Sequence, residues 1–209
     1  MKVILVNGSP KGEGCTYTAL SEVAGALKAN GIEVEIFHIG AAAIPGCIAC
    51  LKCREGLGHC VFNDAVDRFA EKAKDADGFI FGSPVYYAGV NGALCAFMDR
   101  LFFTYGKSFK GKPAAGIISC RRGGSTAAFD RMNKYFTINQ MPIVSSNYWN
   151  MVHGSTPADV KKDLEGLQVM RTLGNNMAWL LKCIRAGKEA GIEMPKGEDK
   201  IYTNFIRGD

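Results

Sequence analysis

Little in the sequence would direct the chain to a membrane or to a nucleic acid. Its first apolar run, MKVILV, stops before Gly8 and is too short for a signal-peptide core or a transmembrane helix. The net charge is only +5, and the Lys and Arg residues are scattered along the chain rather than clustered in a basic patch. We therefore predict a cytoplasmic protein with no membrane or nucleic-acid partner.

Several familiar catalytic patterns are also missing. The loop after the first apolar run has neither the G-x-G-x-x-G fingerprint of dinucleotide-binding folds nor the G-K-[ST] of a P-loop. No Ser/His/Asp set and no pair of carboxylates stands out as a hydrolytic centre. Hydrolysis and phosphoryl transfer are therefore disfavoured as activities.

What the sequence does have is an alternation of short apolar runs with helical stretches. The apolar runs are expected to be strands, at residues 2–10, 34–40, 79–84, 113–120 and 141–149. A long final helix is expected to begin at Thr156-Pro157 and to run, with a break near Gly174, to about Gly187. Continuous apolar strands between helices are typical of a parallel sheet covered on both faces.

This alternation predicts the α/β class, a three-layer α/β/α sandwich around a doubly wound, five-stranded parallel sheet of order 2-1-3-4-5. We expect a single domain over residues 1–209, with a cysteine-rich loop insertion at 45–62 and an extended C-terminal tail from about residue 188. In such a sheet, ligands bind beyond the carboxyl ends of the strands.

Three loops are expected at that end, and the first is NGSPKGEGCTYT. It joins a strand to a helix, so its backbone N–H groups and the helix N-terminus together favour an anion. It offers hydroxyls and one cation around two glycines, without a Mg²⁺ ligand, and these groups come from Ser9, Lys11, Thr16 and Thr18. That set suits a single terminal phosphate that is held in place without phosphoryl chemistry.

The second and third loops are typical of a site for a planar ring. GSPVYYAGVNGAL places Tyr86 and Tyr87 at the end of a strand, where a ring can lie beside an aromatic ligand, and Gly89 permits close backbone approach. In SCRRGGSTAAF, Gly123 and Gly124 permit tight backbone contact, and Arg121 or Arg122 could place positive charge near the ligand. Together the three loops predict a site for a flat heteroaromatic ring that carries one phosphate.

Four of the eight cysteines lie within one short stretch in the pattern C-x2-C-x2-C-x6-C: Cys47, Cys50, Cys53 and Cys60. Without an export signal, this pattern favours metal or redox chemistry over disulfides. The first three match the start of the bacterial ferredoxin run, and Gly56 and Gly58 would let the loop fold back so that the fourth closes the same cluster. Structural zinc, a thiol–disulfide relay and four idle thiols are the alternatives.

Three of the remaining cysteines fall in helical or strand patterns and are expected in the core: Cys95, Cys120 and Cys183. His59, beside Cys60, is expected on the surface.

The stretches GSPKGEGCTYT, SPVYYAGVNGALCAFMDRL and SCRRGG resemble those of the flavodoxin-like NAD(P)H:FMN oxidoreductases, and the cysteine motif resembles that of the iron–sulfur flavoprotein branch. The likeness covers about the first 150 residues and includes YWN at Tyr148–Asn150. It implies FMN, bound by Ser9, Lys11, Thr16 and Thr18 at the phosphate, by Pro84, Val85, Tyr86 and Tyr87 at the isoalloxazine, and by Arg121, Gly123 and Gly124 at its N1/C2 side. Gly89, Ser119 and Cys15 complete the expected set, although Cys15 stands where relatives often have Ser or Asn.

The resemblance implies an FMN-dependent oxidoreductase that relays electrons between a reductant and an acceptor through FMN and a [4Fe–4S] cluster held by the four cysteines. One alternative is an NAD(P)H-dependent FMN, quinone or nitro reductase without a cluster, and another is a non-enzymatic flavodoxin-like metal-binding module. The acceptor would be a redox protein such as a ferredoxin or a small molecule, with NAD(P)H as co-substrate. The flavin carries the chemistry, Tyr148 and Trp149 would lie on the substrate side, and a homodimer or homotetramer is expected.

Overall fold

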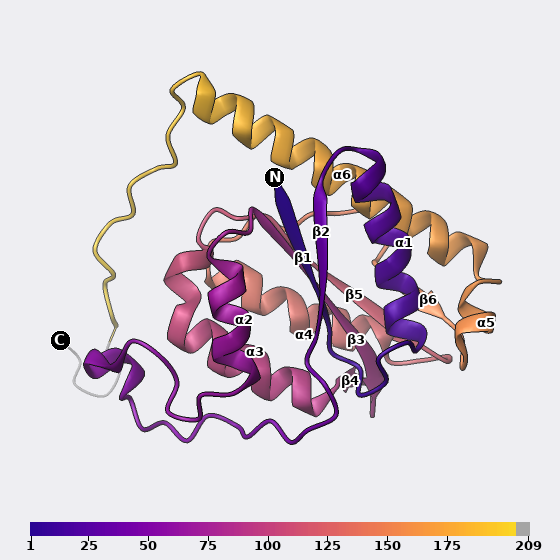
Figure 1. The fold of residues 1–209 in the computed structure, drawn as a ribbon, viewed down its shortest axis with the longest axis horizontal. Helices are drawn as coiled ribbons and strands as arrows, with labels where there is room; N and C mark the ends of the chain where they lie inside the picture. Colours follow the sequence, from indigo (N-terminus) through magenta and orange to yellow (C-terminus); the bar gives the residue numbers. More distant parts are fainter. Residues whose placement is uncertain (204–209) are drawn as a thin grey trace.

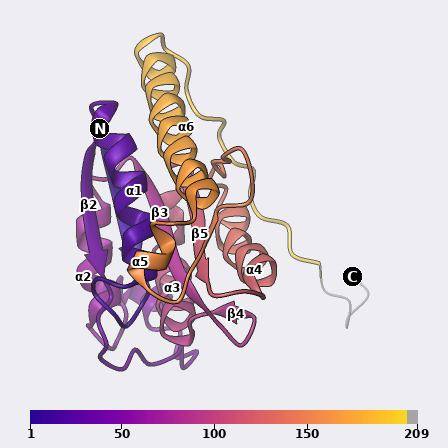
Figure 2. The same ribbon diagram turned by 90° about the vertical axis from the view of Figure 1, so that its right-hand side faces the viewer.

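The computed structural model describes residues 1–203, and one sheet lies between two layers of helices (Figures 1 and 2). The strands are β1 (Lys2–Asn7), β2 (Glu33–His38), β3 (Gly78–Tyr86), β4 (Gly89–Val90), β5 (Ala114–Cys120) and β6 (Met151–His153). The helices are α1 (Cys15–Ala29), α2 (Ala65–Ala73), α3 (Gly92–Tyr105), α4 (Ser125–Ile138), α5 (Pro157–Val160) and α6 (Leu164–Glu189), with short helical turns η1 (Cys53–Leu57) and η2 (Gly106–Phe109).

The parallel strands follow the order β2-β1-β3-β5-β6, and the short β4 pairs with β3 in the antiparallel sense. With β4 set aside, this is the predicted order 2-1-3-4-5, so the doubly wound α/β sandwich is confirmed. The switch in direction falls between β1 and β3, which are direct neighbours.

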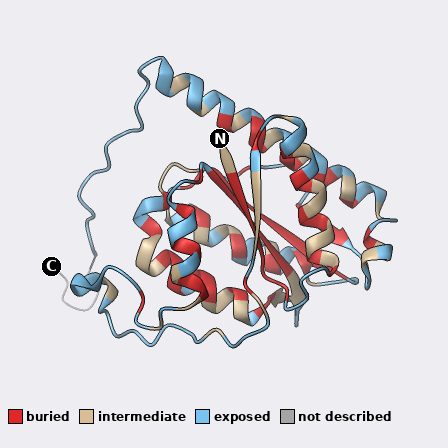
Figure 3. Ribbon diagram, in the orientation of Figure 1, coloured by how far each residue is buried: buried red, intermediate tan, exposed pale blue. Residues whose placement is uncertain are grey.

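Alternate side chains of each strand enter opposite helix layers, as the period of two requires. On β1, Val3 and Leu5 pack with α1 and α6, whereas Ile4 and Val6 pack with α2, α3 and α4. The second layer is rich in phenylalanine, with rings in tilted or edge-to-face contact: Phe69, Phe79, Phe81, Phe97, Phe102, Phe109 and Phe136. Figure 3 shows this buried interior along the sheet, while the cysteine-rich loop and the C-terminal tail lie outside it.

The predicted fifth strand at residues 141–149 is wrong, because the strand that pairs with β5 is β6, further along the chain. Within 141–149 the structure has one isolated bridge, between Ala114 and Ile143. Met141 and Val144 are buried, at 4% exposure each, so the apolar pattern reflects two core side chains rather than a ladder. Polar groups then turn the chain, since Ser146 Oγ donates to the Tyr148 carbonyl.

The predicted final helix is also broken in a different place. The break separates α5 from α6, where the Asp163 side chain accepts a hydrogen bond from the Gly166 N–H and caps α6. Gly174 lies inside α6 and against α1, since an added Cβ would stand 2.7 Å from Ala26 Cβ and 2.8 Å from the Val23 carbonyl. This glycine therefore permits close helix packing and does not interrupt the helix.

The tail predicted from about residue 188 begins where α6 ends, at Glu189, and is extended through residue 203 (Figure 1). The end of the chain, residues 204–209, lies outside the described residues. Among the described helices, none combines the length and the apolar character needed to cross a membrane.

Candidate functional site

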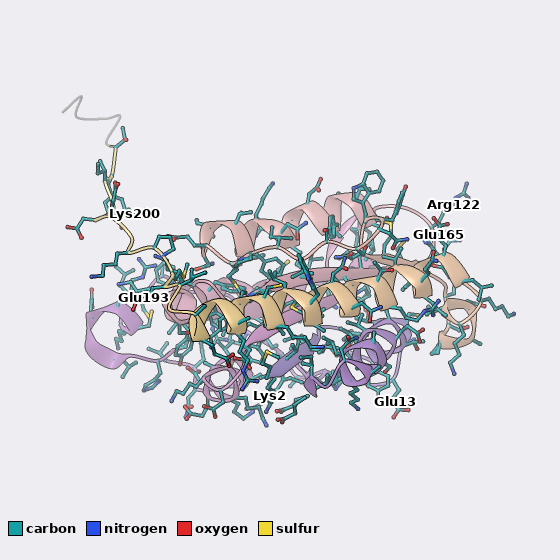
Figure 4. All side chains as sticks on the ribbon, turned by 90° about the horizontal axis from the view of Figure 1, so that it is seen from above. Lys2, Glu13, Arg122, Glu165, Glu193 and Lys200 are labelled. Atoms are coloured by element: carbon teal, nitrogen blue, oxygen red, sulfur yellow. The ribbon has the colours of Figure 1, made fainter. Side chains whose placement is uncertain are left out.

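The three loops predicted to bind one ligand meet at the carboxyl ends of β1, β3 and β5. The Gly8 N–H donates to the Gly82 carbonyl at 2.9 Å, which joins the first loop to the second. A Cβ on Gly124, whose φ is +87°, would stand 2.6 Å from Ala88 Cα, so the third loop rests on the second. Figure 4 shows Glu13 of the first loop and Arg122 of the third at one end of the molecule, away from Glu193 and Lys200 of the tail.

Two residues that the sequence analysis missed hold the first loop in shape. Asn7, fully buried at the end of β1, accepts from the Ser9 N–H and donates to the Lys11 and Gly12 carbonyls. His38, at the end of β2, donates from Nε2 to the Ser9 carbonyl at 2.8 Å. A polar residue that ends an otherwise apolar strand was the available signal for Asn7, whereas His38 is brought to the loop only by the pairing of β2 with β1.

The predicted phosphate ligands occupy different positions around this loop. Lys11 is exposed, and Ser9 Oγ accepts a hydrogen bond from the Lys11 N–H. Thr18 Oγ1 donates to the Gly14 carbonyl. Thr16 is buried, at 1% exposure, and its hydroxyl lies 2.9 Å from that of Ser119, so these two predicted ligands contact each other across the loops.

Cys15, the residue that departs from the resembled pattern, is half-buried at the start of α1. Its thiol donates a weak hydrogen bond to the Gly154 carbonyl at 3.7 Å, and burial raises its pKa. The side chain therefore faces the segment that follows β6.

The helices that begin at the first and third loops lack side-chain caps. Gly14 precedes α1 and Gly124 precedes α4, and neither helix has an acidic residue in its first turn. By contrast α2, α3, α5 and α6 are capped by the side chains of Asp64, Asn91, Thr156 and Asp163. The first-turn N–H groups of α1 and α4 are thus free of side-chain acceptors, and the positive end of each helix dipole favours an anionic ligand.

The second loop is a tight hairpin between β3 and β4. Tyr87 and Ala88 both have positive φ, of 47° and 59°, in a turn where glycine or asparagine is the usual choice. Tyr87 is completely exposed and Tyr86 is 48% exposed, whereas Val85 lies against Gly124. Strained backbone of this kind is concentrated at ligand-binding sites. The other two predicted members, Pro84 and Gly89, are half-buried on the two strands of the hairpin.

The rest of the predicted ring site is open. Arg121, Arg122 and Gly123 are exposed in the third loop. Tyr148 and Trp149 are exposed as well, with ring centroids 4.8 Å apart, and they precede the buried Asn150, whose amide donates to the Gly116 carbonyl. The aromatic pair is therefore anchored next to β5.

The four cysteines of the motif line one small pocket between the loop after β2 and the carboxyl-terminal half of α3. Cys47 and Cys50 are exposed, Cys53 is half-exposed and Cys60 is buried. Ala49 and Leu51 have positive φ, of 52° and 59°, as do Gly56 and Gly58, so the backbone turns repeatedly between the thiols. Repeated turns of this kind direct backbone N–H groups inward and are found around iron–sulfur sites.

The cysteine loop is held to the domain by α2 and α3. Arg54 stacks on Phe103 of α3, with its Cζ 3.8 Å from the ring centroid. The Cys60 N–H donates to Asp67 of α2, whose carboxylate also accepts a hydrogen bond from the Tyr105 hydroxyl. Burial, and to a lesser extent this hydrogen bond, raise the pKa of Tyr105. Among residues 1–203, no three His, Cys, Asp or Glu side chains gather closely enough to hold a single metal ion, so the thiols share a pocket without converging on one point.

The cysteines outside the motif divide into core and surface positions. Cys120 is buried and Cys95 is half-buried, and burial raises the pKa of both. Cys183 is exposed on α6, so its predicted core position is wrong, because the helical pattern did not fix which face of α6 it occupies. His59 is exposed, as predicted.

A larger cleft, of about 820 Å³, lies at the amino ends of the strands between α6 and the tail. Its lining includes Met1, Pro113, Leu181 and Met194 and contains none of the predicted site residues. The candidate site is therefore defined by the loops and their hydrogen bonds, and it does not coincide with this cleft.

The fold, with its loops at the carboxyl ends of the strands, is that of a flavodoxin-like α/β protein. The family model described as NADPH-dependent FMN reductase matches residues 1–156. An iron–sulfur flavoprotein of Methanocaldococcus jannaschii is 35% identical over 195 residues, which cover 88% of this chain and 100% of the relative. The chain belongs to the NADPH-dependent FMN reductase family, in its iron–sulfur flavoprotein branch.

Solved structures agree at the level of the fold. A flavone reductase superposes with a TM-score of 0.70 at 18% identity, covering 88% of this chain and 64% of that chain. An archaeal flavodoxin superposes with a TM-score of 0.57 at 17% identity, covering 87% of this chain and 99% of that chain. The family match and the curated relative show that the chain is a flavin-dependent oxidoreductase, so the non-enzymatic alternative is set aside.

Proposed function

We propose that this protein is an electron-transfer flavoprotein that holds FMN at the three loops and a [4Fe–4S] cluster at Cys47, Cys50, Cys53 and Cys60, and that relays electrons between a reductant and an acceptor. The observation that carries the proposal is the single pocket lined by all four cysteines. Their chemistry fits the cluster, because thiolates are the usual ligands of iron–sulfur centres.

The first loop suits the phosphate of FMN on three grounds. Exposed Lys11 supplies charge, the first turn of α1 supplies uncapped N–H groups, and Asn7 keeps the loop in place. Thr18 and Ser9 offer hydroxyl groups at the same loop. A phosphate monoester would thus meet a site assembled before it arrives, with little cost of ordering.

The second and third loops suit the ring. When bound, FMN supplies hydride and single-electron chemistry at its ring system. Tyr86 and Val85 would lie along the ring, while Gly124 lets the third loop approach the hairpin closely. Arg121 would place positive charge near the N1/C2 edge, where it favours the anionic reduced form.

A cluster-free reductase is the second candidate. The Escherichia coli FMN reductase (NADPH) is 33% identical over 102 residues, although these cover only 48% of each chain. In this alternative NAD(P)H would reduce FMN, and a quinone, a nitroaromatic compound or free flavin would accept the electrons, with the thiols idle.

The identity of the acceptor and the assembly state are part of the proposal. A ferredoxin-like protein or a small molecule would exchange electrons with the bound cofactors, and sedimentation is expected to give a homodimer or a homotetramer. A cytoplasmic location is proposed as well, since a reducing compartment keeps the four thiols free to bind iron.

The deciding experiment is to quantify iron, sulfide and FMN in protein purified without oxygen. We expect about four irons and one FMN per chain in the wild type. Cys50→Ala should lose the iron and keep the FMN, whereas Cys183→Ala, which removes another exposed thiol, should keep both. Full FMN without iron in the wild type, or rapid NAD(P)H oxidation by Cys50→Ala, would instead favour the cluster-free reductase.

A further inference from the structure

Arg100 is the largest fully buried side chain in the described residues, with 1% exposure. It lies on α3, and a buried guanidinium is costly unless its donors are satisfied. Here the carboxylate of Asp64 accepts from both terminal nitrogens, at 2.7 and 3.0 Å, and the Pro45 carbonyl accepts a further bond. The ring of Phe62 lies 4.7 Å from Arg100 Cζ.

The remaining donors of Arg100 point at a sulfur. Its Nε and one terminal nitrogen lie 3.2 and 3.1 Å from Cys60 Sγ. A guanidinium stays protonated in proteins, and the ion pair with Asp64 offsets the cost of burying this charge. Cys60 is the buried member of the four cysteines, which removes the solvent screening that would weaken this contact.

The contact with Arg100 distinguishes Cys60 from the other three cysteines of the motif. Cys47 and Cys50 are exposed, and Cys53 is only half-buried. Cys60 alone among the motif cysteines receives a cation with two directed N–H groups. Hydrogen bonds to ligand sulfur and nearby positive charge both favour the more negative, reduced form of an iron–sulfur cluster.

We propose that Arg100 is a positioning residue that raises the reduction potential of the cluster by donating two charge-assisted hydrogen bonds to Cys60. This inference rests on the proposed function, since it needs the cluster at the four cysteines. The same residue also pairs with Asp64, which caps α2, so a purely structural role must be separated from the electrostatic one.

The test is a redox titration of anaerobically purified, iron-counted protein, in which the electron paramagnetic resonance signal of the reduced cluster reports its midpoint potential. Arg100→Met should shift the cluster midpoint to a more negative value, and Arg100→Lys should shift it less. The FMN midpoint, followed by absorbance in the same titration, should not move.

Two variants serve as matched controls. Asp64→Asn keeps the donors of Arg100 but removes a negative charge, so the midpoint should stay or become less negative, opposite to Arg100→Met. Arg68→Met removes the same charge from an exposed side chain of α2, and solvent screening should leave the midpoint nearly unchanged. If Arg100 had a purely structural role, Asp64→Asn and Arg100→Met would shift the cluster midpoint in the same direction.

The outcomes distinguish a failure of the proposed cluster from a failure of the proposed role of Arg100. A wild-type chain without iron contradicts the proposed function and this inference with it. An iron-loaded Arg100→Met protein with an unchanged cluster midpoint overturns the role of Arg100 alone. If Arg100→Met does not retain iron, the cluster midpoint of Arg100→Lys is the deciding measurement. An ammonium group cannot reproduce the fork of two N–H groups, so this midpoint should be more negative than that of the wild type. A wild-type midpoint in Arg100→Lys overturns the proposal.

Discussion

The three loops at the carboxyl ends of β1, β3 and β5, called here the flavin loops, and the cysteine loop at residues 45–62 are built in different ways within one chain. The flavin loops grow out of the buried sheet and are cross-linked by interior groups such as Asn7 and the Thr16–Ser119 pair. The cysteine loop leaves the sheet after β2 and runs outside the buried interior (Figure 3). Cys47 and Cys50 are exposed, Cys53 is half-buried and Cys60 is buried. The loops at the ends of β1, β3 and β5 are therefore continuous with the core, whereas the proposed cluster would complete the cysteine loop.

The largest effect should follow from removing the metal. A chelator under reducing conditions should expose residues 45–62 to proteolysis, because the four thiols then lose the centre that ties them together. The rest of the chain and the bound FMN should persist, since the sheet and the flavin loops use none of these cysteines. Limited proteolysis with mass mapping, with and without chelator, is the measurement.

The matched control for metal removal is removal of FMN. Loss of FMN should leave the cleavage pattern at residues 45–62 unchanged while the cluster is present. If chelation instead releases FMN or unfolds the sheet, the two regions are one cooperative unit and the comparison fails.

The next effect should come from filling the contact between β1 and β3. In Gly8→Ala the added Cβ would lie 2.5 Å from Leu94 Cδ2 and 2.8 Å from the Gly82 carbonyl, so backbone has to move. We expect a loss of about 3 kcal/mol in the free energy of unfolding, at the upper end for overpacking, together with weakened FMN binding. Denaturant unfolding and fluorescence titration with FMN would measure the two effects.

Gly12→Ala is the control in the same loop. Its nearest neighbour would be the His38 ring at 3.7 Å, an ordinary contact, so its unfolding free energy should change by less than about 0.5 kcal/mol. Equal losses in both variants would show that the loop is soft and that the β1–β3 contact does not organise the site.

The first four strands and the three loops could be placed from the sequence because apolar runs and glycines are local patterns, and the sheet order followed from the doubly wound fold that this alternation favours. Sequence reasoning misplaced the last strand because Met141 and Val144 are buried without forming a ladder. It missed Arg100 and His38 because each reaches its site across the fold: Arg100 lies forty residues after Cys60 and His38 twenty-nine after Ser9. Contacts at that separation follow from topology, which the pattern of a single segment does not contain.

The smallest effect on stability separates two residues that the sequence placed in the same role. Thr16→Val removes a buried hydroxyl that pairs with Ser119, and should lower the free energy of unfolding by about 1 kcal/mol. Lys11→Ala should leave stability unchanged, because Lys11 is exposed, but should weaken FMN binding by about 2 kcal/mol, roughly thirtyfold in Kd. Combining Thr16→Val with Ser119→Ala should cost less than the sum of the single changes if the pair is structural. A thirtyfold loss of FMN affinity in Thr16→Val as well would instead mean that its hydroxyl turns from Ser119 to the phosphate, and that the flavin loops, like the cysteine loop, are completed by their ligand.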